Sequence, residues 1–201
     1  MVGLLLGAIA APMSAQVVDQ SNYGASGYFG SAQNWQGQTF RPAAGTSAGA
    51  GFQVINTAGD VSGTVNIQLW SALASTPGAT LLASGSSAYS ILSGQTAMLD
   101  AFWGAVAVTP GAQYFIAFNA NNGSLVSLFT GDAYAGGQAQ YNYSATDPTQ
   151  SYTCCGGGYD LGFEEFSTSG VVATPEPASL ALVATGLLGI GGVVRRRRQN
   201  T

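Results

Sequence analysis

Apolar and polar residues alternate through the middle of the chain with the two-residue period of a β-strand. Val65, Ile67 and Leu69 are separated by Asn66 and Gln68, so an extended chain places the apolar side chains on one face and the amides on the other. The same pattern predicts further strands at 38–41, 51–56, 80–84, 96–102, 105–108, 113–119, 124–130, 138–143 and 160–166.

Turn-forming clusters separate the predicted strands. They include Pro77-Gly78, Pro110-Gly111 and Gly136-Gly137, and no window outside the two chain ends repeats apolar residues every 3.6 positions. Short strands with regular turns favour an all-β antiparallel β-sandwich of the jelly-roll type. The aromatic residues expected in its core are Trp70, Phe102, Trp103, Phe115 and Phe118.

The N-terminal residues 1–15 are apolar and end in Pro12 and the small residues Ser14 and Ala15. This pattern predicts a secretory signal peptide, with cleavage after Ala15. A buried N-terminal strand or helix is the alternative. The basic residues that usually open a signal peptide are missing, and a start codon upstream of Met1 would restore them.

The C-terminal region carries a second apolar segment, residues 178–194, which spans 17 residues without a charge. At about 1.5 Å per residue, a helix of this length reaches the short end of the membrane-crossing range. Arg195, Arg196, Arg197 and Arg198 follow at once. The arginines predict a transmembrane helix with a cytoplasmic basic tail, which places residues 16–177 on the other side of the membrane.

Charge is scarce and strongly uneven along the chain. Nine acidic and five basic residues make up only 7 % of the 201 residues, and there is no histidine or lysine. This composition excludes Ser-His-Asp and Cys-His catalysis, Schiff-base lysines and histidine-ligated metals. Arg41 is the one cation before the arginine run, so nucleic-acid binding is not expected.

The C-terminal region resembles a known sorting signal. Pro175, Glu176 and Pro177 precede the apolar segment and the arginine run, and this order resembles the PEP-CTERM signal of Gram-negative envelope proteins. The resemblance implies recognition by an exosortase, a transient inner-membrane anchor, and delivery to the cell surface or to an extracellular matrix rich in exopolysaccharide. The predicted organisation is a signal peptide (1–15), a β-sandwich domain (16–170), a linker (171–177), a transmembrane helix (178–194) and a basic tail (195–201).

The domain itself has a looser resemblance. The motifs GQTFRP (37–42), VTPGAQYFI (108–116), YAGGQAQY (134–141) and DLGFEEF (160–166) are similar to those of small exported jelly-roll domains with the architecture of carbohydrate-binding modules. Each motif is typical of a strand and turn and not of a site. The resemblance therefore bears on the fold more than on the function.

Tyrosines are the best candidates for a ligand-binding face. Apolar sugar faces dock onto exposed rings while amides bind the hydroxyls, although tyrosines are also good strand formers. The candidate glycan-binding residues are Tyr134, Tyr141, Tyr143, Tyr152 and Tyr159.

Two further candidates concern cysteines and calcium. Cys154 and Cys155 are adjacent before three glycines, so a strained vicinal disulfide, intermolecular pairing and free thiols all remain open. Acids and amides in the turns could hold a structural calcium, or could simply be solvated turn residues. Glu164 and Glu165 are expected on opposite faces of one strand, so they cannot both coordinate one calcium ion.

We therefore expect a non-enzymatic, exported structural protein of the cell surface or of a biofilm matrix. The alternative is a carbohydrate-binding module with a tyrosine-lined glycan site. A hydrolase of matrix polymers is a third interpretation, because glycosidases need only two carboxylates, but the sequence nominates no such pair.

Overall fold

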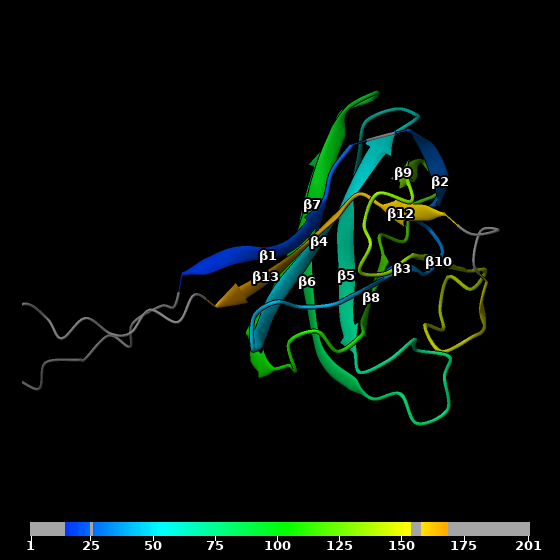
Figure 1. Ribbon diagram of the computed structural model, residues 1–201. Coiled ribbons are helices and arrows are strands. Elements are labelled where there is room, and N and C mark those ends of the chain that lie inside the picture. Colours follow the sequence, from blue (N-terminus) through cyan, green and yellow to red (C-terminus); the bar gives the residue numbers. More distant parts are fainter. Residues whose placement is uncertain (1–14, 25, 154–157, 169–201) are drawn as a thin grey trace, which may run out of the picture. The chain divides into compact units, whose positions relative to one another are not determined.

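The structure is a computed structural model that describes residues 15–24, 26–153 and 158–168. Residues Gln16–Thr168 form one compact unit, in which two antiparallel sheets pack face to face (Figure 1). The predicted all-β sandwich is confirmed. Most of the predicted signal peptide and all of the predicted C-terminal helix lie outside the described residues; within them, no helix has the length and apolarity to cross a membrane.

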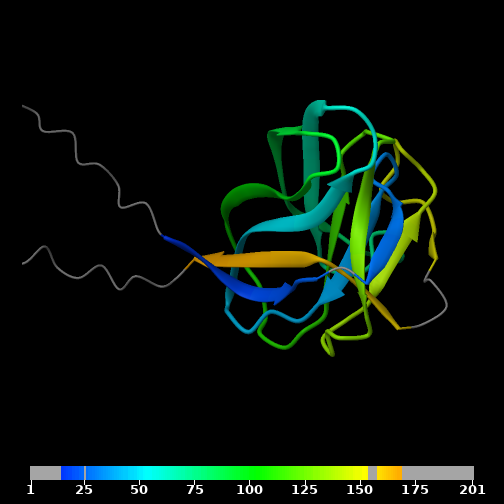
Figure 2. The same cartoon turned by 90° about the horizontal axis from the view of Figure 1, so that it is seen from above.

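The first sheet, which we call sheet A, has the order β1-β13-β4-β9-β12, with β2 paired to β9 and β7 paired to β4. Its strands are β1 (Gln16–Asn22), β2 (Gly27–Ser31), β4 (Thr46–Asn56), β7 (Thr96–Ala107), β9 (Leu125–Gly131), β12 (Tyr159–Leu161) and β13 (Phe163–Thr168). Figure 2 shows β1 and β13 running side by side, as their antiparallel pairing requires.

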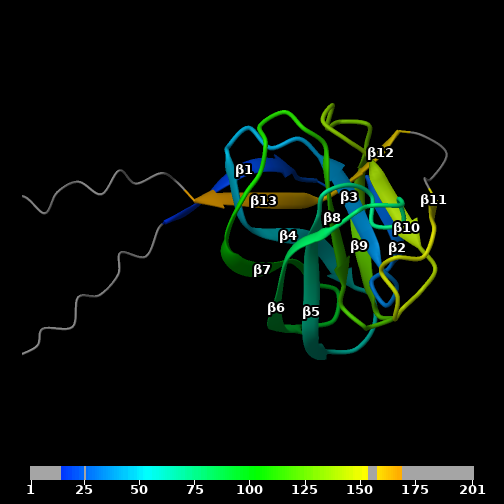
Figure 3. The ribbon, with the colours of Figure 1, turned by 90° about the horizontal axis from the view of Figure 1, so that it is seen from below.

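The second sheet, sheet B, has the order β11-β10-β3-β8-β5-β6. Its strands are β3 (Gln36–Phe40), β5 (Val61–Trp70), β6 (Leu81–Ile91), β8 (Tyr114–Asn119), β10 (Ala139–Asn142) and β11 (Tyr152–Thr153). Figure 3 shows β2, β10, β11 and β12 gathered at one end of the sandwich.

The main core lies between the two sheets. Val65, Ile67 and Leu69 are fully buried there, as their alternation predicts. Phe52 of sheet A stacks on Phe118 of sheet B, with ring centroids 4.1 Å apart. This contact joins the two layers. Both side chains have a large apolar area, and the removal of that area from water stabilises the sandwich.

Sheet B also carries a second apolar cluster on its outer face. In β8, Ile116 and Phe118 point into the main core, whereas Phe115 and Ala117 pack in the outer cluster with Trp70. β8 is therefore buried on both faces. The loop that follows β5 supplies part of the cover, because Leu73 and Ala74 belong to the same cluster.

Several strand boundaries differ from those predicted. The segment 160–166 is two strands, because Gly162 donates its N–H to the Leu128 carbonyl while its own carbonyl accepts from Gln53, and the chain thereby passes from β9 to β4. The segments 96–102 and 105–108 are one strand, β7, and the segment 80–84 is the start of the longer β6.

Three strands were not predicted at all: β1, β2 and β11. β1 contains Asp19 at a break in its pairing with β13, and β2 is short and rich in glycine and serine. Neither has the clean alternation of a half-buried strand. Pairing to a neighbouring strand, rather than local pattern, holds these segments extended.

The assignment of Phe102 to the core was wrong. Phe102 is 47 % exposed and lies on the outer face of sheet A, where its ring crosses over Gly49 and packs against Phe166. A glycine at position 49 leaves room for the ring, since a Cβ there would lie 2.4 Å from Phe102 Cδ1. The aromatic residue is therefore a surface contact between strands.

Candidate functional site

A continuous row of aromatic rings crosses the end of the sandwich formed by β2, β9, β10 and β12. The ring centroids of Tyr143 and Tyr141 lie 4.9 Å apart, and Tyr141 lies 6.0 Å from Phe29. Phe29 lies 6.4 Å from Phe129, which is 4.8 Å from Tyr159. We call these five residues the aromatic row. All four contacts are edge-on, the arrangement that aromatic pairs favour.

The aromatic row is accessible from solvent. Tyr143 is 76 % exposed at one end, and Tyr159 is 38 % exposed at the other. Beside Tyr159, a hollow of about 210 Å³ is lined by Tyr28, Phe29, Phe129 and Tyr159. Rings that offer open faces and edges to water are suited to apolar ligand surfaces.

Tyr141 is the best-fixed member of the row. Its hydroxyl accepts a hydrogen bond of 2.6 Å from Asn34 Nδ2, and its ring lies against Gly30. A Cβ at position 30 would lie 2.6 Å from Tyr141 Cε2, so glycine is needed for this approach. A ring that is held before binding loses little entropy when a ligand arrives.

The five predicted tyrosines therefore divide into two groups. Tyr141, Tyr143 and Tyr159 belong to the aromatic row. Tyr134 is half-buried against Phe163, where burial raises its pKa, and its hydroxyl donates to Gln20 Oε1 at 3.0 Å. Tyr152 is buried in the outer cluster of sheet B, and burial raises its pKa as well.

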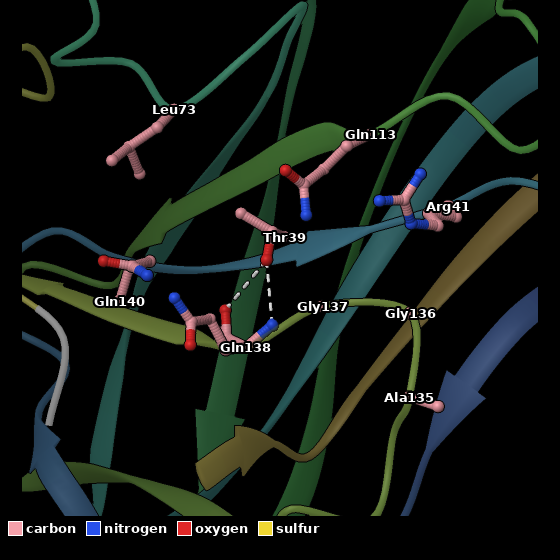
Figure 4. Close-up of a pocket in the computed structure, with 9 residues that line it drawn as sticks. All are labelled: Thr39, Arg41, Leu73, Gln113, Ala135, Gly136, Gly137, Gln138 and Gln140. Atoms are coloured by element: carbon pink, nitrogen blue, oxygen red, sulfur yellow. Dashed lines mark hydrogen bonds between the residues drawn. The ribbon is translucent and has the colours of Figure 1, made fainter. Parts of the chain in front are cut away.

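A polar groove lies over β3 and β10 on sheet B. Its volume is about 370 Å³, within the ~300–1,000 Å³ common for small-molecule sites. Figure 4 shows Arg41 and Gln113 toward one end and Leu73 and Gln140 toward the other. Gln138 lies below them at the edge of β10.

The groove combines three of the motifs quoted from the sequence, because Arg41 lies in GQTFRP, Gln113 in VTPGAQYFI and Gln138 in YAGGQAQY. Thr39 ties two of these segments together: its Oγ1 accepts from the Gln138 N–H at 2.8 Å. Gly137 lies so close to β3 that a Cβ would approach the Thr39 carbonyl oxygen to 1.7 Å. Sequence reasoning missed this groove because its residues meet only when β3, β8 and β10 are paired.

One of the turn acids is a buried structural group and not a solvated one. Asp160 is fully buried and accepts from Gln38 Nε2 and from the Tyr134 N–H, each at 2.8 Å. A structural calcium was one of two alternatives for the turn acids, and it has no support here, since the described residues contain no group of three or more Asp, Glu, His or Cys that could hold a metal ion. Cys154 and Cys155 lie outside the described residues.

The structure also joins two acids that the sequence did not pair. Asp100 and Glu164 are on strands that flank Gly51, and a Cβ at position 51 would meet Asp100 Oδ1 at 2.0 Å. Burial, and then the negative charge of Glu164, raise the pKa of Asp100 to about 6. Tyr23 donates to Glu164 Oε2 at 2.6 Å. As expected, Glu164 and Glu165 lie on opposite faces, since Glu165 is fully buried.

Together, a β-sandwich and a C-terminal sorting signal define a class of exported proteins in which the signal sets the destination of the domain. Residues 173–198 match the PEP-CTERM protein-sorting motif, as predicted from Pro175, Glu176, Pro177 and the arginine run. No curated protein matches the chain. The chain is thus an exosortase-sorted PEP-CTERM protein with a β-sandwich domain, and proteins of this kind are exported and sorted to the cell surface.

Proposed function

We propose that this protein is a non-enzymatic structural component of the surface or extracellular matrix of a Gram-negative bacterium, where it lies among exopolysaccharide. The sorting motif at 173–198 carries the proposal, because it specifies export and processing. In this account the chain passes through an inner-membrane-anchored intermediate held by residues 178–194. The exosortase then acts near Pro175-Glu176-Pro177.

We further propose that the sandwich is a jelly roll. The order β2-β9-β4-β7 in sheet A and β3-β8-β5-β6 in sheet B supports this, because the strands from β2 to β9 alternate between two four-stranded layers, except that β5 and β6 pair within sheet B. In sheet B, β10 and β11 extend the layer beyond β3, whereas in sheet A β12 pairs with β9, β13 pairs with β4, and β1 pairs with β13. This fold supports many unrelated functions, so the role must be argued from the surface.

The second candidate function is carbohydrate binding, and the aromatic row favours it. Exposed rings in a line can stack on successive sugar units of one chain. The exported domain bears eight acids and one arginine over residues 16–170, which disfavours indiscriminate adhesion to anionic polymers. The rings thus offer a selective surface without a general charge attraction.

Glycan-array binding by the full chain, purified in mild detergent, separates the two functions. For a module, we expect saturable binding to one glycan class, weakened about three- to tenfold by Tyr143→Ala or by Tyr141→Ala, since aromatic contacts contribute about 0.5–1.5 kcal/mol. Tyr23→Ala is the matched control, because Tyr23 is 55 % exposed but lies outside the row.

Weak binding to every glycan would contradict the carbohydrate-binding function and would be consistent with the structural role. The structural role has its own test, which is extraction of the native matrix. We expect the protein to co-purify with exopolysaccharide and its deletion to soften the biofilm. An unchanged biofilm, with all of the protein in the soluble medium, would contradict it.

A further inference from the structure

Arg41 is the one cation in the exported domain, which otherwise carries eight acids over residues 16–170. It is exposed at the end of the polar groove and forms no ion pair with any acid in the described residues. A lone arginine among excess acids usually pairs with a carboxylate of its own chain. Here the guanidinium is instead directed to a space where a ligand can reach it.

The position of Arg41 is fixed by the backbone. Its Nη1 donates to the Gly111 carbonyl at 2.8 Å, and its own N–H donates to Tyr134 Oη at 3.2 Å. Gly111 adopts a φ of 76°. Its N–H donates to the Pro42 carbonyl at 2.8 Å, so the segment that contains Gly111 is bonded to the segment that contains Arg41 in both directions. One of five guanidinium N–H groups is thus used, and the others remain available for a bidentate partner.

Besides Arg41 and the paired hydroxyl of Thr39, three glutamine amides line the groove. The side chains of Gln113, Gln138 and Gln140 make no hydrogen bond within the described part of the chain. Gln140 is only 5 % exposed and lines the groove, so its backbone and stem are held in place while its amide has no partner in the described residues. Amides that are not paired within the chain are available to bind the hydroxyls of a ligand.

We propose that the polar groove binds an acidic sugar, with Arg41 pairing to the carboxylate of a uronic acid unit and the three glutamines binding its hydroxyls. Amide donors and acceptors match sugar hydroxyls, and the planar guanidinium matches a carboxylate. Leu73 supplies an apolar wall for the C–H face of the ring. The groove is independent of the aromatic row, so this site does not depend on the second candidate function.

The charge of the domain makes the site selective. The other described acids repel an anionic polymer over long range, so attraction is confined to the neighbourhood of Arg41. A uronate that binds here must therefore be recognised by the groove and not by general electrostatics. Its affinity should fall only modestly with salt, because one charge pair is formed.

Two probes that differ only at the carboxyl groups test the proposal: a galacturonic acid tetramer and its uncharged methyl ester, titrated against the full chain in mild detergent. We expect the acid form to bind at least about tenfold more tightly than the ester, since a charge-assisted hydrogen bond contributes about 1.5–3 kcal/mol. Arg41→Gln should remove this preference and leave weak ester binding unchanged. Arg41→Lys should keep part of the preference for the acid, because lysine carries the charge but lacks the planar guanidinium that binds a carboxylate through two hydrogen bonds.

Tyr23→Ala is the matched control and should leave acid binding intact, because Tyr23 is 55 % exposed and lies outside both the polar groove and the aromatic row. An unchanged melting temperature for Arg41→Gln verifies that the domain stays folded. Equal binding of acid and ester, no binding of either probe, or full acid binding by Arg41→Gln would each overturn the proposal.

Discussion

Glu165 is the residue whose chemistry departs most from its ordinary behaviour in water. It is fully buried, and burial followed by the nearby charge of Asp19 raises its pKa to about 8, although Ser47 partly opposes the shift. The carboxyl therefore holds a proton in the folded protein at neutral pH. Unfolding releases that proton wherever the pH exceeds the ordinary value for a glutamic acid.

This predicts a specific dependence of stability on pH. Because the folded pKa lies above the unfolded one, the contribution of Glu165 is complete below about pH 4.5, falls as the pH rises, and is lost above about pH 8. Glu165→Gln should flatten the stability profile between about pH 6 and pH 8, because at lower pH the raised pKa of Asp100, about 6, gives a slope of the same sign. It should also raise the free energy of unfolding at pH 8 by about 2–4 kcal/mol. Urea denaturation from pH 4 to pH 9 measures both effects, with Asp132→Asn, at an exposed acid, as the control. A slope between about pH 6 and pH 8 that persists in Glu165→Gln would contradict this assignment.

Among the elements, sheet B depends on glycines that let neighbouring strands approach. Gly37 in β3 has no space for a side chain: a Cβ would lie 2.3 Å from the Ile116 carbonyl oxygen and 2.4 Å from the Phe115 ring. Gly104 in β7 is the opposite case, with no neighbouring atom within 4 Å of such a Cβ. The two positions therefore form a matched pair.

Gly37→Ala should lower the free energy of unfolding by about 2–3 kcal/mol, because overpacking against backbone cannot relax. Gly104→Ala should be neutral or stabilising by up to about 1 kcal/mol, because alanine restricts the unfolded chain. Thermal unfolding of the two variants measures the difference. Equal melting temperatures would mean that β3 and β8 are not packed as closely as described.

Where side chains alternate cleanly, the sequence predicts the elements well. β8 was predicted nearly to the residue, and β5 was predicted over 64–70, because Val65, Ile67 and Leu69 repeat every second position and a strand must bury that face. The alternation pattern did not predict β1, β2 and β11, because these strands are specified by pairing with other strands and not by their own sequence. The two candidate sites were foreseen only in part: the aromatic row includes three predicted tyrosines, whereas the polar groove depends on strand neighbours that no local pattern reveals.

At the scale of the whole molecule, destination and binding surface are encoded in different parts of the chain. The sorting motif at 173–198 follows the compact unit Gln16–Thr168, which contains both the aromatic row and the polar groove. Removal of the C-terminal segment would leave every strand pairing of the sandwich in place. Processing and binding should therefore be separable by mutation.

Mass spectrometry of the mature C-terminus, in the producing bacterium and in a strain without its exosortase, tests whether the sorting motif at 173–198 is processed. We expect the surface protein to end near Pro175-Glu176-Pro177, and the full chain through Thr201 to accumulate in the inner membrane when the exosortase is absent or when Glu176 is replaced. An intact C-terminus on surface protein, identical in both strains, would contradict sorting by this motif.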